Sequence, residues 1–308
     1  MSATPAAKPV FLEKFMQKIK KIKFGFPWEY LREGAVELFQ KAGYKVEIDE
    51  HSYRIEIDDP EIECITSKVE ELAPLVEKGI VDVGITEKAF ILDSKAKVVA
   101  LVDLDYGYNT WRAAKIVLAV PANSKIKSVK DLEGKRIATW VPEIATDYLK
   151  KHRVKAEIEF TNMRTETICP GLVDGIIEFI NTGVTLTTYK LKIIDTLMET
   201  SPWLIANKKA WEDKWKREKI ENLAMLLKGA RLAQEYAGLM LHASNDMMAK
   251  VLKALPSLKK PTVTHLRGEN WFDVLTVAKK KKIRELIPKL KKIGCTDIVE
   301  FPLNKVIV

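Results

Sequence analysis

The feature that most constrains the fold is an alternation of short apolar runs with longer amphipathic segments. Residues 115–121, KIVLAVP, form a continuous apolar run that is typical of a strand covered on both faces of a sheet. Near the amino terminus, KIKFGF predicts a strand, and GAVELFQKAGYKVEI predicts a helix that stops at Gly43 and a second strand. The alternation continues through GIIEFI at residues 175–180. It predicts two doubly wound α/β lobes that hold a ligand between them, at the carboxyl ends of strands.

The size and composition predict several packed units. A chain of 308 residues exceeds one ordinary domain, and an apolar content of 47% excludes a disordered protein. No apolar run approaches the roughly 18 to 20 residues that span a bilayer, and the start lacks a signal-peptide core. The cysteines are Cys64, Cys169 and Cys295, whose spacing suits neither a zinc knuckle nor a disulfide framework. We therefore expect a soluble, cytoplasmic protein.

The net charge of +9 favours anionic partners, either phosphorylated small molecules or nucleic acid. The clearest basic block, at residues 278–294, carries apolar residues at helical spacing, so its lysines are expected to form a solvated helix face. We predict no nucleic-acid partner. Residues 10–22 predict a lysine-rich amphipathic helix with Phe11, Phe15, Ile19 and Ile22 on one face. This helix is expected to pack on its own domain or on a neighbouring subunit rather than to attach to a membrane surface.

The segment DGIIEFINTGVTL, residues 174–186, carries the clearest chemistry. A glycine flanked by threonines lets backbone amides close around a phosphate, the hydroxyls donate further hydrogen bonds, and the upstream acids can hold sugar hydroxyls. The pattern indicates a sugar-phosphate site. The competing interpretation is a buried strand, IIEFI, that ends in an ordinary polar turn.

This segment resembles the phosphoribosyl-pyrophosphate loop of ATP phosphoribosyltransferases, whose usual form is D-A-I-x-D-L-V-S-T-G-x-T-L. The resemblance extends through GIVDVGIT at residues 79–86, KIVLAVPANS at 115–124 and SVKDLEGKRIAT at 128–139. It continues through SPWLIAN, LPSLKKPTVTHLRGENW and IGCTDIVEFPLNKVI, so that it covers nearly everything after Lys23. The order and spacing of these pieces are specific, and the last stretch, from about residue 223 to residue 308, resembles the regulatory domain of the long form of the family.

The resemblance implies transfer of 5-phosphoribose from phosphoribosyl pyrophosphate to N1 of ATP, the first step of histidine biosynthesis. It implies a two-lobed, periplasmic-binding-protein-like catalytic core and a small carboxy-terminal α+β domain of the ferredoxin-like type. The expected units are a helical extension at 1–22, a discontinuous lobe I at 23–111 and 188–222, lobe II at 112–187 and a regulatory domain at 223–308. A homo-oligomer, dimer or hexamer, is expected, with histidine as the effector. His265 is a candidate effector residue, and the competing interpretation is an ordinary histidine at the edge of a strand.

The residues that match the loop motif receive roles from the resemblance. The 5′-phosphate would be held by the main-chain amides and hydroxyls of Asn181, Thr182, Gly183, Val184, Thr185 and Leu186. Asp174 and Glu178 would act as the catalytic carboxylates, binding the ribose hydroxyls and stabilising positive charge at the anomeric carbon. Mg²⁺ would arrive with phosphoribosyl pyrophosphate and neutralise the leaving pyrophosphate. No metal site made only of protein ligands is predicted.

The acceptor side of the site departs from the family pattern. P-x-K-G-R-L is replaced by a segment from Pro27 to Leu31, G-I-T-G-x-D reads GITEKA at residues 84–89, and the approach to the next strand is aromatic. The candidate acceptor residues are Trp28, Glu29, Tyr30, Thr86, Glu87, Tyr106, Arg112 and Lys115. Three hypotheses stay open: other cations restore ATP binding, the aromatic side chains bind a different aromatic acceptor by stacking, or the protein is a non-catalytic binding or regulatory relative.

Overall fold

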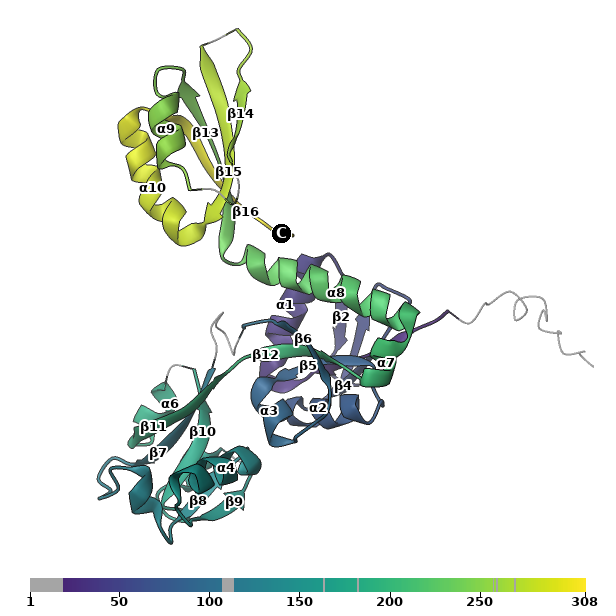
Figure 1. The fold of residues 1–308 in the computed structure, drawn as a ribbon, viewed down its shortest axis with the longest axis vertical. Helices are drawn as coiled ribbons and strands as arrows, with labels where there is room; N and C mark the ends of the chain where they lie inside the picture. The colour runs from purple at the N-terminus through teal and green to yellow at the C-terminus, as the bar shows by residue number, and fades with distance from the viewer. Residues whose placement is uncertain are drawn as a thin grey trace, which may run out of the picture.

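The structure is a computed structural model that describes residues 19–106, 114–162, 164–181, 183–256, 258, 260–268 and 270–308. Three bodies make up this part of the chain: two lobes lie next to each other, and a third domain is attached through a long helix (Figure 1). Of the predicted helical extension at 1–22, residues 1–18 lie outside the described residues, and Ile22 already belongs to the first strand. Within the described part, no helix has the length and apolar character that crossing a membrane requires.

The first lobe contains a five-stranded mixed sheet. In spatial order its strands are β4 (Ile62–Ser67), β1 (Ile22–Pro27), β5 (Val83–Glu87), β12 (Pro202–Ala206) and β6 (Val99–Asp103). β1 runs parallel to β4 and β5, whereas β12 is antiparallel to both of its neighbours. The helices of this lobe are η1 (Glu29–Leu31), α1 (Arg32–Ala42), α2 (Val69–Glu77), α3 (Lys88–Asp93), α7 (Lys208–Glu212) and α8 (Lys214–Ala233), and β2 (Val46–Asp49) pairs with β3 (Arg54–Ile57) in a separate hairpin. Figure 1 shows α1 and α8 on one side of the sheet and α2 and α3 on the other.

The second lobe repeats this plan. Its strands are, in spatial order, β9 (Glu157–Phe160), β8 (Arg136–Thr139), β10 (Gly175–Ile180), β7 (Ala114–Pro121) and β11 (Leu191–Thr200). Its helices are η2 (Val129–Leu132), α4 (Pro142–His152), α5 (Thr165–Ile168) and α6 (Val184–Thr188). In each sheet the fourth position is held by a strand that arrives from the other lobe, β12 in the first and β7 in the second. The predicted two-lobed, periplasmic-binding-protein-like α/β core is therefore confirmed.

Two predicted domain boundaries lie too early in the chain. Residues 188–200 are predicted to belong to lobe I, but β11 pairs with β7 in the second sheet, so the chain re-enters lobe I only at Ser201. The border between residues 222 and 223 falls inside α8, whose Leu223, Leu227 and Ala230 belong to the core of lobe I. Both errors have one cause: the alternation in the sequence identifies a strand or helix but does not say which sheet or core it joins.

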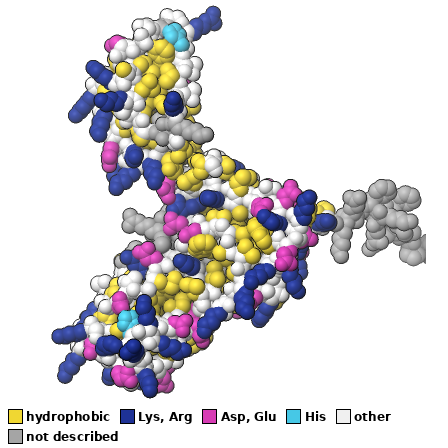
Figure 2. Space-filling model, in the orientation of Figure 1, with side chains coloured by type: hydrophobic (Ala, Val, Ile, Leu, Met, Phe, Trp, Pro, Cys, Tyr) yellow, Lys and Arg dark blue, Asp and Glu magenta, His cyan; other side chains and the backbone are white. Residues whose placement is uncertain are grey.

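The third domain has the predicted ferredoxin-like architecture. Its chain order is β13 (Tyr236–Ser244), α9 (Met248–Ala254), β14 (Thr262–His265), β15 (Trp271–Lys279), α10 (Lys280–Ile293) and β16 (Thr296–Pro302). The sheet order is β14-β15-β13-β16, and every neighbouring pair is antiparallel. In α10 the apolar side chains Ile283, Leu286 and Leu290 are buried. Figure 2 shows basic side chains on the outer side of this helix, as predicted for a solvated face.

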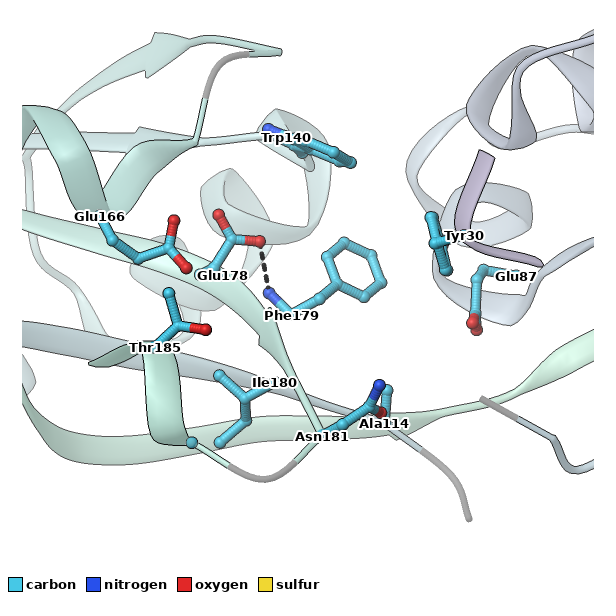
Figure 3. A pocket seen from close by; sticks show the side chains of 11 residues that line it. Tyr30, Glu87, Ala114, Trp140, Glu166, Glu178, Phe179, Ile180, Asn181 and Thr185 are labelled. Atoms are coloured by element: carbon cyan, nitrogen blue, oxygen red, sulfur yellow. Dashed lines mark hydrogen bonds between the residues drawn. The ribbon is translucent and has the colours of Figure 1, made fainter. Parts of the chain in front are cut away.

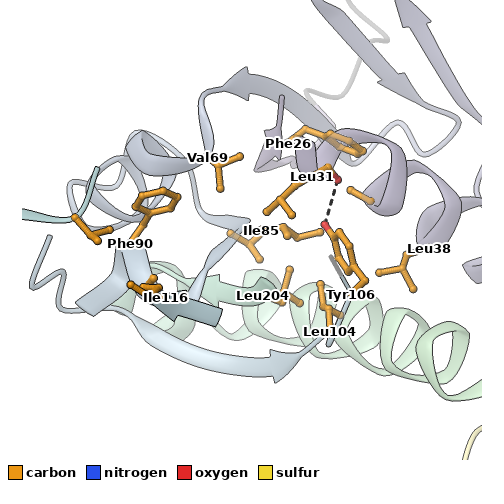
Figure 4. Close-up of a cluster of buried hydrophobic side chains, with 14 of the residues drawn as sticks. Phe26, Leu31, Leu38, Val69, Ile85, Phe90, Leu104, Tyr106, Ile116 and Leu204 are labelled. Carbon is orange, nitrogen blue, oxygen red and sulfur yellow. Dashed lines mark hydrogen bonds between the residues drawn. The ribbon is translucent and has the colours of Figure 1, made fainter. Parts of the chain in front are cut away.

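Tyr106 lies in the core of lobe I and not in a ligand site. Its side chain is 1% exposed, and its hydroxyl donates to the Leu31 carbonyl at 3.3 Å (Figure 4). The ring covers Gly34 of α1, where an added Cβ would lie 2.5 Å from a ring carbon. The prediction that Tyr106 binds the acceptor is therefore wrong: an aromatic residue after β6 fills the space between α1 and the sheet.

We expect Gly34→Ala to lower the free energy of unfolding by about 1 to 2 kcal/mol, because the new methyl group overpacks the contact with Tyr106. In an open helix the same change would be stabilising by up to about 1 kcal/mol. Chemical denaturation measures the difference, and Glu33→Ala, at the exposed neighbouring position of α1, serves as the control within about 0.5 kcal/mol of the original protein. A Gly34→Ala protein as stable as the original would contradict the packing described here.

Candidate active site

A cavity of about 350 Å³ lies between the two lobes. The first lobe contributes Tyr30 and Glu87. The second contributes Ala114, Trp140, Glu166, Glu178, Phe179, Ile180, Asn181, Gly183 and Thr185. Figure 3 shows the two first-lobe side chains on one side of the space and Trp140, Glu166, Glu178 and Thr185 on the other. The cavity lies where β5 and β10 end, which is the position that a doubly wound sheet favours for ligands.

The predicted phosphate loop forms one rim of the cavity. β10 ends at Ile180, Gly183 adopts a left-handed φ of 75°, and α6 begins at Val184. The amides in the first turn of a helix have no carbonyl partner within that helix, so they are available to an anion. Thr185 lines the cavity, whereas Leu186 is 2% exposed and fastens the turn to the core of the second lobe. Thr182, also predicted to bind the phosphate, lies outside the described residues.

Glu178 is a buried carboxyl group in the wall of the cavity. It is 7% exposed, Oε2 accepts a hydrogen bond from the hydroxyl of Thr165, and Oε1 accepts the Phe179 amide at 2.7 Å. Burial raises the pKa of Glu178 to about 7, and the two hydrogen bonds oppose that rise. The group is thus held near the midpoint of its titration at neutral pH, in a fixed orientation.

Glu87 occupies the equivalent place in the first lobe. Glu87 is the last residue of β5, which is the third strand in the sheet of the first lobe. Glu178 lies on β10, which is the third strand in the sheet of the second lobe. Its side chain is 1% exposed, and Oε2 accepts the hydroxyl of Thr200 at 2.8 Å. Burial raises the pKa of Glu87 to about 7. Tyr30 stands beside it, and burial together with the charge of Glu87 raises the pKa of the Tyr30 hydroxyl well above its usual range, so that this hydroxyl stays protonated.

Asp174, the other predicted catalytic carboxylate, is not part of this cavity. It precedes β10, and the six residues of that strand span roughly 20 Å between it and the phosphate loop. Its Oδ2 accepts the backbone amide of Arg136 at 3.0 Å, and its Oδ1 lies 3.8 Å from Nζ of Lys135. The prediction that Asp174 acts at the sugar is therefore wrong. The residue joins the beginning of β10 to β8, and the motif alone could not show that its two acids lie far apart along one strand.

The other residues predicted to bind the acceptor either lie away from the cavity lining or fall outside the described residues. Thr86 is fully buried and its hydroxyl donates to the Val69 carbonyl at 2.6 Å, a structural role. Trp28 lies outside the cavity lining and packs against Arg32, whose guanidinium carbon is 4.5 Å from the ring centroid. The other two described residues are exposed and do not line the cavity: Glu29, and Lys115, whose Nζ lies 3.6 Å from a carboxylate oxygen of Glu199. Arg112 lies outside the described residues.

Five lining residues are not identified by sequence reasoning: Ala114, Trp140, Glu166, Phe179 and Ile180. Trp140 directly follows β8, so the rule that ligands bind at the carboxyl ends of strands could have identified it. Phe179 contacts Phe90 of the other lobe, with ring centroids 5.3 Å apart. Nothing in the sequence pattern singles out Glu166.

The described lining of the cavity is acidic. It contains the three glutamates named above and neither lysine nor arginine. In the part of the chain that the structure describes, no group of three or more potential ligands could hold a metal ion by itself. A divalent cation that brings its own anionic ligands would be compatible with such a lining, because Mg²⁺ commonly binds one or two carboxylates together with substrate phosphates.

Comparison with known proteins identifies related sequences over most of the chain. A family model described as ATP phosphoribosyltransferase matches residues 68–229, and one described as the C-terminal domain of the same protein matches residues 233–305. An ATP phosphoribosyltransferase of Chlorobium phaeobacteroides is 43% identical over 286 residues, covering 93% of this chain and 97% of that protein. One of Thermodesulfovibrio yellowstonii is 42% identical over 290 residues, covering 94% and 99%.

Among solved structures, the ATP phosphoribosyl transferase (HisG:HisZ) complex from Thermotoga maritima contains a chain of similar fold. The TM-score is 0.57 at 20% sequence identity, and the match covers 67% of this chain and 98% of that chain. At this identity the similarity supports the fold of the two-lobed core and nothing more.

We expect Glu178→Gln to stabilise the protein increasingly as the pH rises. The folded-state pKa of Glu178 is raised, so the original protein loses unfolding free energy between about pH 4.5 and about pH 7, where its buried carboxyl group gives up its proton. The amide does not titrate, so the variant should gain on the order of 1 to 3 kcal/mol relative to the original by pH 8 and almost nothing at pH 4.5.

Urea denaturation at a series of pH values measures this difference. Ile180→Val, at another cavity position, adds or removes no titrating group, and its effect should stay constant across the series. A constant difference for Glu178→Gln as well would show that the carboxyl group is not buried as described.

Proposed function

The chain belongs to the ATP phosphoribosyltransferase family, a family of pentosyltransferases, and from this premise we propose that the cavity between its lobes is the place of phosphoribosyl transfer. The family reaction joins the 5-phosphoribosyl group of phosphoribosyl pyrophosphate to N1 of ATP and releases pyrophosphate, which is the first step of histidine biosynthesis. One observation carries the assignment: the loop at Gly183 to Thr185, Glu178 of the second lobe and Glu87 of the first lobe line the same cavity.

The donor is proposed to bind on the side of the second lobe. The 5′-phosphate would accept hydrogen bonds from the first amides of α6 and from the Thr185 hydroxyl, as the left-handed turn at Gly183 allows. Glu178 would then accept a ribose hydroxyl and stabilise the positive charge that develops at the anomeric carbon. Thr165 and the Phe179 amide already hold its carboxyl group in place, so little reorganisation accompanies the reaction.

Mg²⁺ is proposed as a companion of the donor. When bound, it would neutralise charge on the departing pyrophosphate. The acidic lining supports this, because a pyrophosphate facing three glutamates without a counter-ion would be strongly repelled. Glu166 and Glu178 are the lining residues that could contribute an oxygen ligand or hold a coordinated water.

ATP is the proposed acceptor, in preference to a different aromatic acceptor and to a non-catalytic role. Relatives of almost the same length carry the name ATP phosphoribosyltransferase, which favours ATP over a different aromatic compound. Tyr106, one of the residues that suggested a flatter aromatic pocket, belongs to the core. The two buried carboxyl groups facing one cavity also argue against a merely structural or inactive remnant, because burying them opposes folding at neutral pH.

Cytoplasmic location, a homo-oligomeric assembly and feedback by histidine on the third domain are further proposals drawn from family membership. His265, the candidate effector residue, is exposed on β14 and its ring contacts that of Phe272 at a centroid distance of 5.0 Å. Histidine titration followed by calorimetry, with His265→Ala as the comparison, would show whether this strand contributes to an effector site.

We expect the purified protein, given ATP, phosphoribosyl pyrophosphate and Mg²⁺, to release pyrophosphate in a coupled assay. Release should require all three components, and Glu178→Ala should reduce kcat by at least about ten-fold because charge stabilisation at the sugar is lost. A folded protein that binds both nucleotide and donor without releasing pyrophosphate would contradict the proposed function.

We expect Thr185→Ala to raise the KM for phosphoribosyl pyrophosphate by about five- to ten-fold, the equivalent of about 1 kcal/mol for one lost hydrogen bond to a phosphate. The KM for ATP should change little. Thr188→Ala is the matched control, because its hydroxyl lies on the same helix and donates to the Val184 carbonyl, away from the cavity. Equal effects of the two variants on donor binding would place the phosphate elsewhere.

A further inference from the structure

Glu87 presents one free carboxylate oxygen to the cavity from a fixed position. The Thr200 hydroxyl donates to Oε2 at 2.8 Å, and the Ala89 amide donates to that hydroxyl at 3.1 Å, which sets the orientation of the threonine. Within the described residues, no hydrogen bond engages Oε1 of Glu87. The side chain is 1% exposed, yet it lines the cavity. Its second oxygen is therefore available to accept a hydrogen bond from a ligand in that space.

The surroundings of Glu87 favour a flat, uncharged group with hydrogen-bond donors. Figure 3 shows Tyr30 next to Glu87 and Trp140 on the opposite side of the space, with the ring of Phe179 reaching between them. Aromatic faces suit the stacking of a heterocycle. The three glutamates of the described lining favour an uncharged group over a triphosphate in this part of the cavity, because none of the described lining residues is a cation that could pair with phosphate oxygens. Of the parts of a nucleotide acceptor, the base fits these conditions best.

We propose that Glu87 is a specificity-determining residue that accepts a hydrogen bond from the exocyclic amine of the acceptor purine. The inference rests on the proposed function and deepens it: the site would take a 6-aminopurine and reject a 6-oxopurine, whose oxygen would face the carboxylate. On adenine the amine is next to N1, so anchoring it on the first lobe turns N1 towards the donor site on the second lobe, where Glu178 and Thr185 lie. Near pH 7 the ionised form of Glu87 is accessible, and a donor supplied by the ligand would stabilise it.

The same contact assists the transfer step. The lone pair of N1 forms the new bond to the anomeric carbon, the bond from that carbon to the pyrophosphate oxygen breaks, and its electron pair leaves with pyrophosphate. The purine gains one positive charge, which is shared between N1 and the amine through C6. The proton stays on the amine, whose hydrogen bond to the Glu87 carboxylate strengthens as the charge develops, so the interaction is worth more in the transition state than in the ground state.

The test compares the discrimination between ATP and inosine triphosphate in three proteins: the original, Glu87→Gln and Glu87→Met. Calorimetry gives the dissociation constants of both nucleotides and of phosphoribosyl pyrophosphate, and pyrophosphate release gives kcat with ATP. The original protein should prefer ATP by at least about ten-fold, because a site built to accept a hydrogen bond rejects an analogue that cannot donate it. Glu87→Gln keeps an acceptor oxygen and should retain part of the preference, whereas Glu87→Met should reduce it to less than about three-fold.

Two controls separate this role from a structural one. Glu199→Met removes a carboxylate of the same charge from the exposed position next to Thr200, and its nucleotide preference should equal that of the original protein. Binding of phosphoribosyl pyrophosphate should be unchanged by either substitution of Glu87. An unchanged preference in Glu87→Met, or an equal loss of both nucleotides and the donor, would overturn the inference. If the original protein released no pyrophosphate from ATP, the proposed function itself would fail.

Discussion

The double crossing of the chain between its lobes is the constraint on which the site depends. β7 is the first strand after the chain leaves the first lobe, and β12 is the first strand after it returns. Each takes the place beside the third strand of its sheet, antiparallel to it. As a result the third strands, β5 and β10, end at the same cavity, and Glu87 faces the wall that contains Glu178. Neither lobe alone contains both walls. The site therefore depends on the two crossings of the chain between similar sheets and not on a single local motif.

The electrostatic properties of the cavity depend on the buried glutamate that each lobe contributes. Each lobe buries a glutamate and orients it with one threonine hydroxyl, Thr200 for Glu87 and Thr165 for Glu178. Burial raises the pKa of both groups to about 7, so each can hold or release a proton near neutrality. The hydrogen bonds limit this rise and fix the carboxyl groups before a ligand arrives. Two preorganised acids in a lining without described cations suit a reaction that builds positive charge on a sugar and on a purine.

The sequence predicts the positions of some cavity residues and not of others. The turn at Gly183 is predictable because a glycine between polar residues after a strand indicates a left-handed backbone conformation. The position of Asp174 is not predictable from the motif alone, because a strand extends by about 3.3 Å per residue and the first acid of the motif therefore lies at the opposite end of β10. The positions of Trp140 and Glu166 at the cavity depend on how β8 and α5 pack against β10, which the local sequence does not show. The aromatic ring of Tyr106 suits a ligand site as well as a core, and its burial and its contact with Gly34 identify it as a core residue.

By itself the sequence determined the strands and helices, the α/β class, the family resemblance and the glycine turn after β10, because periodicity, glycine positions and motif spacing are local properties. It contained no detectable repeat, although the two sheets share one strand order. The tertiary structure alone decided which sheet receives β11, which acids face each other and which aromatic rings are core. These outcomes depend on strand pairing and packing between residues that are far apart along the chain. The sequence around each residue therefore does not predict them.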